Sequence, residues 1–447
     1  MDELSKENYL FKEEKISKVL LKIAPPVMLS QFIMALYNIV DSLYVGKYSD
    51  HALNALTVIY PLQLIIVALA TGTGVGVNTF MAKKYALNDT KSANKTAGTG
   101  LLLAIVSWLI FAISSCLLMN VYVNATAKSV ESIQYAKSYG YIICIGSLGS
   151  FLEGVWSKVI QAKGNMKLPM IAQVVGALIN IILDPILIFG VGIIPSLGVI
   201  GASIATIIGQ ICSAIIVSFK GIRKIFFSKE TFYYIKQIYF YGYSSIFMQL
   251  LFTVYIELLN LILASFSEDA VTVLGLYYKL QSFFFIPLFG LQVCIVPFLS
   301  YNYTICQYSR CKKIMNHSFI ISAIFMLLGI ICFTLIPKQL MTLFSANNNV
   351  MQIGSVAFPI IGSSFISAVF SLMMPVFFQS IGKGIESVFL SLLRQIICLV
   401  PIFYAFSFVG LNYVWLAFPL SETIAGSIGI ILYIKELKKW KKLSYSK

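Results

Sequence analysis

The sequence predicts an all-α polytopic membrane protein with twelve transmembrane helices in two six-helix lobes, related by a parallel pseudo-twofold repeat. The first observation is composition: hydrophobic residues make up 58% of the 447 residues, charged residues 11%, and the mean hydropathy is +0.85. The second is a set of apolar runs of about 18 residues or more, which are long enough to cross roughly 30 Å of hydrocarbon as helices. The third is an internal repeat.

The repeat consists of identical residues that recur 218 positions further along the chain. The pairs are Gln31 and Gln249, Tyr37 and Tyr255, Ala52 and Ala270, Tyr60 and Tyr278, Gln63 and Gln281, Gly72 and Gly290, Gln161 and Gln379, and Gly164 and Gly382. Each half contains six spans, an even number, so both halves insert in the same orientation. Duplication of this kind is typical of transporters whose halves face each other across a substrate site.

The predicted elements follow one another with short connections. The twelve spans are expected at 23–46, 53–82, 97–121, 137–160, 168–190, 197–219, 237–265, 270–300, 317–336, 351–380, 386–408 and 411–434. The first six form an N-lobe over residues 1–219, and the last six form a C-lobe over residues 237–447 that ends in a basic tail. Residues 220–236 form a basic linker between them, which is expected on the cytoplasmic side.

The distribution of basic residues sets the expected orientation. With both termini cytoplasmic, 27 of the 33 Lys and Arg fall on the inner side of the membrane and four on the outer side, as the positive-inside rule requires. This pattern predicts a multi-pass protein of the cell membrane, and it explains the net charge of +15 without a nucleic-acid partner. The basic tail at 435–442 is expected to anchor to lipid headgroups as a stop-transfer segment rather than form a specific lipid site.

Several site classes find no support in the sequence. The only histidines are His51 and His317, and the eight Cys are scattered without a CxxC pair. We therefore expect neither a histidine-based metal site nor an enzyme, and no cofactor. The glycine-rich segment GTGVG at 72–76 lacks the GK[ST] ending of a P-loop and is expected to allow close helix packing or a bend.

Ionisable residues inside the apolar spans are the candidates for function, because each costs about 2.5–3.5 kcal/mol at mid-membrane. They are Asp41, Glu153, Asp184, Glu257, Lys279, Arg394 and Glu422. Glu153 and Arg394 are expected to have structural roles, with gating as the alternative, and Glu422 has no obvious partner. Glu257 and Lys279 lie equally far from one external turn, so they either form an ion pair or leave Glu257 to bind a cation or a proton.

Asp41 and Asp184 are expected at similar depth in the N-lobe. Asn38 and Asn180 lie one helical turn before them and share their helical faces. A proline at position 185 leaves the carbonyl of residue 181 without its helical donor. This oxygen-rich group suits Na⁺ or a shared proton, while helix–helix hydrogen bonding is the structural alternative.

Polar and aromatic residues repeated in the two halves are candidates to line a substrate cavity. They are Gln31, Gln63, Gln249, Tyr255, Tyr278 and Gln281, and Glu257 is a further candidate that is not repeated. Aromatic rings bind flat amphipathic cations through cation–π contacts. Interhelical hydrogen bonds and lipid-facing packing are the alternatives.

Four segments resemble the multidrug and toxic compound extrusion family. They are APPVMLSQFIMALYNIVDSLYVGKYSDHALNALTVIYP at 24–61, NIILDPILIFGVG at 180–192, LGVIGASIATIIGQ at 197–210 and SLLRQIICLVPIF at 391–403. The resemblance implies twelve helices in two lobes that form a V. It also implies a secondary active antiporter that exports organic compounds across the lipid bilayer in exchange for Na⁺ or H⁺. We expect these compounds to be small amphipathic organic cations, and we expect the protein to be a monomer.

The resemblance also implies site residues. A cation site in the family uses an Asp of span one with an Asn and an Asp of span five, which correspond here to Asp41, Asn180 and Asp184. Ser203 and Thr206 are the candidates for a span-six hydroxyl at this site.

Two further comparisons with the family bear on the C-lobe and on the alternative function. Glu257 resembles a span-seven Glu of some members, but the span-ten Asp of those members is missing from FISAVFSLMMPVFFQ at 365–379, which argues against a cation site in the C-lobe. The alternative function is a flippase of lipid-linked oligosaccharide, which would need several basic residues in its cavity.

Overall fold

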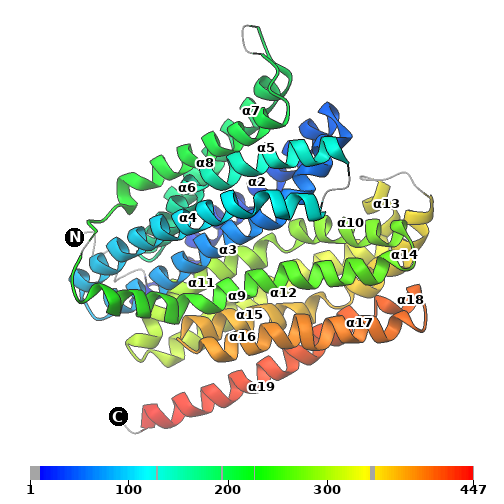
Figure 1. Ribbon diagram of the computed structural model, residues 1–447. Helices are drawn as coiled ribbons and strands as arrows, with labels where there is room; N and C mark the ends of the chain where they lie inside the picture. Colours follow the sequence, from blue (N-terminus) through cyan, green and yellow to red (C-terminus); the bar gives the residue numbers. More distant parts are fainter. Residues whose placement is uncertain (1–10, 127–128, 193–194, 226, 343–347, 446–447) are drawn as a thin grey trace. The chain divides into compact units, whose positions relative to one another are not determined.

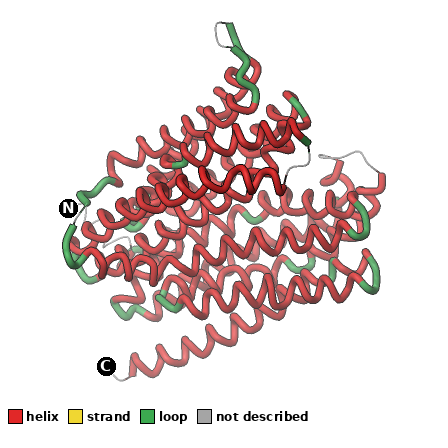
Figure 2. The backbone as a smooth tube through the Cα atoms, in the orientation of Figure 1, coloured by secondary structure: helices red, strands yellow, loops and turns green. Residues whose placement is uncertain are grey.

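The computed structural model describes residues 11–126, 129–192, 195–225, 227–342 and 348–445. Over these residues the secondary structure is helical, without strands (Figures 1 and 2). The helices of the first half are α2 (Ile16–Tyr48), α3 (Asp50–Ala86), α4 (Thr90–Thr126), α5 (Val130–Gly146), α6 (Leu148–Gln161), α7 (Lys167–Phe189) and α8 (Val199–Gly221).

The second half has more, shorter helices. They are α9 (Thr231–Ala264), α10 (Glu268–Phe284), α11 (Ile286–Thr304), α12 (Tyr308–Leu335), α13 (Pro337–Thr342), α14 (Asn348–Gly362), α15 (Phe365–Ser380), α16 (Gly384–Leu392), the π-helix η1 (Leu393–Leu399), α17 (Val400–Ser407), α18 (Leu411–Val414) and α19 (Ala417–Tyr445). Within the described parts of the chain, ten helices are long and apolar enough to cross a membrane, and two bent pairs bring the number to twelve. The twelve-helix prediction is confirmed.

The sequence repeat of 218 positions is also a repeat of helix boundaries. Helices α3 and α10 begin 218 positions apart, as do α4 and α12, and α5 and α14. The two bent pairs are equivalent under the repeat: α5 and α6 meet at 40°, and α14 and α15 meet at 57°. The repeated Gly164 and Gly382 have φ angles of 79° and 86°, which explains why glycine stands at both positions.

Two compact units divide the chain. The first contains Pro25–Ile246, and the second contains Glu14–Ala24 and Phe247–Lys447. The boundaries therefore lie inside α2 and α9, whereas the sequence placed the division between the lobes in the linker at 220–236. Both chain ends lie outside the described residues, so their cytoplasmic location stays a prediction.

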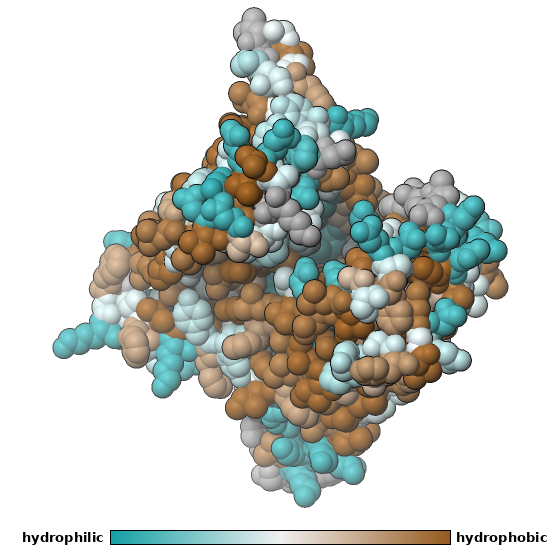
Figure 3. Space-filling model, turned by 45° about the vertical axis from the view of Figure 1, so that its right-hand side comes forward, coloured by the Kyte–Doolittle hydropathy of each residue, from teal (hydrophilic) through white to brown (hydrophobic). Residues whose placement is uncertain are grey.

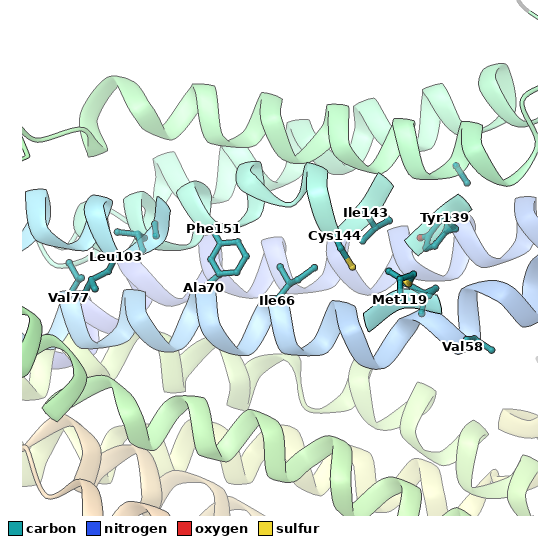
Figure 4. Packing of buried hydrophobic residues seen from close by; sticks show 14 of the residues in the cluster. Val58, Ile66, Ala70, Val77, Leu103, Met119, Tyr139, Ile143, Cys144 and Phe151 are labelled. Carbon is teal, nitrogen blue, oxygen red and sulfur yellow. The ribbon is translucent and has the colours of Figure 1, made fainter. Parts of the chain in front are cut away.

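Helix α3 runs through the hydrophobic core of the first unit (Figure 4). Val58, Ile66 and Ala70 of α3 pack with Met119 of α4, Tyr139 of α5 and other buried side chains of the first unit. These residues belong to spans that also carry large exposed hydrophobic side chains. Figure 3 shows the result on the visible face, where hydrophobic side chains cover broad areas and hydrophilic ones gather in patches. Such apolar surface suits contact with lipid.

The glycine-rich segment of α3 allows close helix packing, as predicted. A Cβ atom on Gly72 would lie 2.2 Å from the Ile246 side chain, and one on Gly76 would lie 2.1 Å from the Ile238 carbonyl oxygen. Both neighbours belong to the first half of α9. Only glycine permits this approach, because any side chain would collide with the backbone or side chain of α9.

Candidate functional site

The predicted acidic pair of the first unit is brought together by α2 and α7. Asp41 is 8% exposed and Asp184 is fully buried, and their side chains lie within hydrogen-bonding reach of each other. Within the described residues, no Lys or Arg forms an ion pair with either carboxylate, and Asp41 Oδ1 has no hydrogen-bond partner. Two carboxylates this close repel each other unless a proton or a cation lies between them.

Asn180 orients this pair from the same helix as Asp184. In the amide orientation that satisfies both of its polar atoms, Nδ2 donates to Asp184 Oδ2 over 3.0 Å. Its Oδ1 then accepts from the backbone N–H of Thr206 over 3.0 Å and from the Thr206 hydroxyl over 3.3 Å. Helix α8 therefore fixes the amide of α7, and the amide fixes one oxygen of Asp184.

Two tyrosines complete the surroundings of the acidic pair, and sequence reasoning did not assign either to the site. Tyr37 lies one turn before Asp41 on α2, and its hydroxyl is within hydrogen-bonding reach of Thr206. Tyr139 of α5 accepts a hydrogen bond from Gln63 Nε2 over 3.1 Å and lies close enough to Asp41 to interact with its charge. The i, i+4 spacing of Tyr37 and Asp41 was the available signal. Nothing in the sequence pointed to Tyr139.

Of the remaining candidate ligands of this site, the structure places one in contact with Asn180 and two elsewhere. The Asn38 side chain is exposed, and the described contacts include no hydrogen bond from it to Asp41. The buried Ser203 hydroxyl donates to the Ile200 carbonyl over 2.7 Å, as expected for a hydroxyl that serves its own helix. Of the two span-six hydroxyls, Thr206 is the one that contacts Asn180.

The second unit holds a buried ion pair where the sequence suggested no partner. Arg394 Nε lies 2.9 Å from Glu422 Oε1 and 3.1 Å from Oε2, and Ser371 also donates a hydrogen bond to Glu422. Arg394 and Glu422 are 6% and 5% exposed. The expectation that Glu422 has no obvious partner is wrong, because the packing of η1 against α19 brings together residues that are 28 positions apart.

Arg394 of this ion pair lies in the π-helix η1. Its widened turn spans Leu393–Leu399 inside an otherwise continuous apolar span, and π-helical turns often occur at functional sites. Tyr255 of α9 lies within hydrogen-bonding reach of Arg394 and is 1% exposed. Tyr255 therefore belongs to the interior of the second unit.

Tyr255 is also part of an aromatic cluster. Its ring centroid lies 5.5 Å from Phe252 and 6.3 Å from Tyr278, and Phe252 lies 6.1 Å from Tyr278. Tyr278 is half-buried, while Phe252 is exposed. The cluster thus extends from the buried Arg394 to the surface of its unit.

Glu257 and Lys279 do not form the expected ion pair. Both side chains are exposed, and no ion pair joins them in the parts of the chain that the structure describes. Equal distance from a turn sets the depth of a residue but not the direction in which its side chain points. In α9, Tyr255 and Leu259 face the interior of the unit, so Glu257 between them points outward.

The other predicted polar residues have varied surroundings. Gln281 is buried, and Gln31 and Gln249 are half-buried. Glu153 of α6 accepts hydrogen bonds from Ser157 over 2.6 Å and from Gln173 over 3.3 Å. The bond from Gln173 joins α7 to α6, which agrees with the structural role expected for Glu153.

Comparison with known proteins agrees with this fold. The sequence model of the MatE family matches residues 26–186 and 244–405, two segments that begin 218 positions apart. The chain is 26% identical over 377 residues to a probable multidrug resistance protein NorM of Thermotoga maritima, covering 80% of this chain and 78% of that protein. It is 21% identical over 435 residues to the multidrug export protein MepA of Staphylococcus haemolyticus, covering 95% and 94%.

A solved structure shows the same fold. A MOP superfamily transporter from Pyrococcus furiosus superposes with a TM-score of 0.90, at 21% sequence identity, over 98% of this chain and 99% of that chain. The family match itself covers well over half of the residues. This chain belongs to the MatE family, the multidrug and toxic compound extrusion family that its sequence resembles.

Proposed function

We propose that this protein exports amphipathic organic cations across the cell membrane in exchange for Na⁺ or H⁺, and that Asp41, Asn180 and Asp184 bind the coupling ion. The observation that carries the proposal is the buried pair of carboxylates in the first unit. Two such groups without a basic partner provide a negative site that is occupied by a proton or a cation. The names of the relatives, a multidrug resistance protein and a multidrug export protein, support export of organic compounds.

The contrast between the two units supports placing the coupling site in the first. Helices α7 and α8 correspond under the repeat to the segment from α16 to α17 and to α19. In the first unit this helix pair carries Asp184, Asn180 and Thr206. In the second unit it carries Arg394 and Glu422, which neutralise each other. Of these two buried groups, the acidic pair of the first unit is the one that needs an external cation to balance its charge.

Two features support a cationic substrate: Glu257 of α9, and the aromatic cluster that Tyr255 and Phe252 of α9 form with Tyr278 of α10. An unpaired carboxylate that faced lipid would be costly, so an exposed Glu257 is better placed beside an aqueous path. Phe252 and Tyr278 would present aromatic rings to a flat cation in the same unit. The flippase alternative needs several basic residues in its cavity. Arg394 is engaged by Glu422, which leaves Lys279 as the single predicted span residue of positive charge for that role.

Uptake of ethidium into everted membrane vesicles tests this function. A Na⁺ gradient and a pH gradient are imposed separately, each with the same membrane potential. We expect one of them to drive accumulation of ethidium in vesicles that contain the wild-type protein. Asp184→Asn keeps the shape of the side chain but removes its charge, and should abolish this accumulation.

Glu153→Gln is the matched control, because it neutralises another carboxyl group of the first unit that contacts neither Asp41 nor Asp184. It should retain gradient-driven uptake. Both variants are compared at equal amounts of monodisperse purified protein. Full uptake by Asp184→Asn would refute the proposed coupling site. Uptake that does not depend on either the Na⁺ gradient or the pH gradient would refute it as well.

A further inference from the structure

The last turns of α19 border a cavity of about 320 Å³ in the second unit. The end of α15, the first turn of α16 and one face of α19 form its walls. Five lysines line it: Lys383, Lys435, Lys438, Lys439 and Lys442. Four of them lie on α19 at helical spacings of three and four residues, so they share one face of that helix.

The buried face of the same helix segment is held against the protein. Trp440 is 2% exposed, and its ring stacks on Tyr308 at a centroid distance of 5.1 Å and contacts Tyr303 at 5.6 Å. Its Nε1 donates to Glu436 over 3.0 Å. This packing sets the rotation of α19 and thereby places the lysine-bearing face of the helix along the cavity.

The charges around the cavity are unbalanced. Glu436 pairs with Lys383 and lies 3.7 Å from Lys439, so its carboxylate is fully engaged. Glu386 is the other acid in the lining, and five lysines against two glutamates leave a net charge of +3. Over the described residues, no ion pair is formed by Lys435, Lys438 or Lys442.

The start of α16 adds to the positive potential. This nine-residue helix begins at Gly384, and no side chain caps its first N–H groups. Uncapped N–H groups at a helix N-terminus attract anions, phosphate above all. The lysine-lined cavity and the helix start therefore favour the same class of ligand.

Apolar side chains beside the cavity indicate that the anion belongs to a lipid. Ile385 of α16 is 78% exposed, and Ile431 and Ile434 of α19 are 52% and 46% exposed. Each is adjacent in sequence to a lining residue. A headgroup in the cavity would thus have an apolar surface next to it for its acyl chains, which a soluble phosphate does not require.

We propose that this cavity binds the phosphate headgroup of an anionic phospholipid. Basic pockets between transmembrane helices recognise such headgroups. The site is more specific than the general headgroup anchor expected from the sequence, because these lysines line a single cavity. The proposal does not depend on which compound the protein transports or on which ion drives transport.

Lipid binding by the purified full-length protein tests the proposal. Native mass spectrometry and the thermal unfolding midpoint are followed during titration with phosphatidylglycerol, phosphatidylcholine or glycerol 3-phosphate. We expect phosphatidylglycerol to bind and to raise the midpoint, and the other two to have little effect. The triple variant Lys435→Gln/Lys438→Gln/Lys442→Gln should need about tenfold or more phosphatidylglycerol for the same effect.

The matched control removes three exposed lysines, one in the last turn of α8 and two in the loop between α8 and α9, as Lys220→Gln/Lys224→Gln/Lys229→Gln. It should bind phosphatidylglycerol like the wild type. Glu386→Gln should bind more tightly than the wild type, a gain that misfolding cannot produce. Equal weakening in both triple variants, or no preference for phosphatidylglycerol over phosphatidylcholine, would overturn the proposal. A full effect of glycerol 3-phosphate alone would assign the cavity to a soluble phosphate and overturn it as well.

Discussion

Arg394 and Glu422 form a buried ion pair inside the second unit, with Arg394 Nε 2.9 Å and 3.1 Å from the two carboxylate oxygens. The pair joins the π-helix η1 to α19. The two buried charges of this pair therefore neutralise each other. The first unit holds two carboxylates and no described basic partner for them.

Breaking this pair from one side should be strongly destabilising, because the remaining charge is buried without a partner. Arg394→Met alone and Glu422→Gln alone are each expected to lower the free energy of unfolding by about 3–5 kcal/mol. The double variant should recover much of that loss, as measured by unfolding in detergent. Lys95 and Glu230 are the control pair, because Glu230 is 61% exposed and an ion pair at the surface contributes little to stability. Simple addition of the two single losses would show that Arg394 and Glu422 are not coupled.

Thr206→Val should weaken binding of the coupling ion without abolishing transport. The variant keeps the shape of the side chain but removes the hydroxyl that donates to Asn180. One lost hydrogen bond is worth about 0.5–1.5 kcal/mol, so the ion concentration for half-maximal transport should rise by roughly two- to tenfold. Ser203→Ala is the control, since the hydroxyl of Ser203 donates to the Ile200 carbonyl of its own helix and, among the described residues, does not contact Asn180. A larger effect of Ser203→Ala would reverse the assignment of the two hydroxyls.

Gly76→Ala should destabilise the first unit. The added methyl group would lie 2.1 Å from the Ile238 carbonyl oxygen, so α3 and α9 must move apart, at a cost of about 1–3 kcal/mol. Gly275→Ala on α10 is the control, because a Cβ there meets no atom within 4 Å and alanine favours a helix. Thermal unfolding of both variants measures the difference. Equal stability of the two would mean that α3 and α9 are not packed this closely.

Asp89, which caps the start of α4, should make the stability of the protein depend on pH. Its Oδ1 accepts from the Ser92 N–H over 3.0 Å, and the hydrogen bonds from Ser92, with help from Lys84, hold the pKa of Asp89 below its ordinary value of 3.8. The contribution of the ionised cap is fully present above pH 3.8 and is lost as the pH falls through the lower pKa of the folded state.

Two variants separate the cap from its charge. Asp89→Ala should cost about 0.5–2 kcal/mol at pH 7, measured by chemical unfolding. Asp89→Asn keeps an acceptor oxygen without the charge, so it should be milder and should lose the dependence on acidic pH. A stability of Asp89→Asn that still falls between pH 5 and pH 3 as in the wild type would assign that dependence to another carboxylate.

The sequence by itself determined the class of the protein, its twelve helices and its internal repeat. Each of these follows from patterns along the chain. A span needs a run of apolar residues because lipid cannot hydrogen-bond the backbone, and a duplicated chain repeats its residues at a constant distance. The acidic pair was also predictable, because Asp41 and Asp184 interrupt apolar spans and Asn180 precedes Asp184 by one turn.

The tertiary structure alone decided which residues meet across helices. Tyr139 joins the acidic pair from α5, and Arg394 and Glu422 form an ion pair although they are 28 positions apart. Glu257 points outward and forms no ion pair with Lys279 among the described residues. Depth in the membrane follows from position along a span, but the direction of a side chain depends on the rotation of each helix. That rotation is set by the packing of whole helix faces, such as Trp440 against Tyr308 or Gly76 against Ile238, and no short segment of sequence contains it.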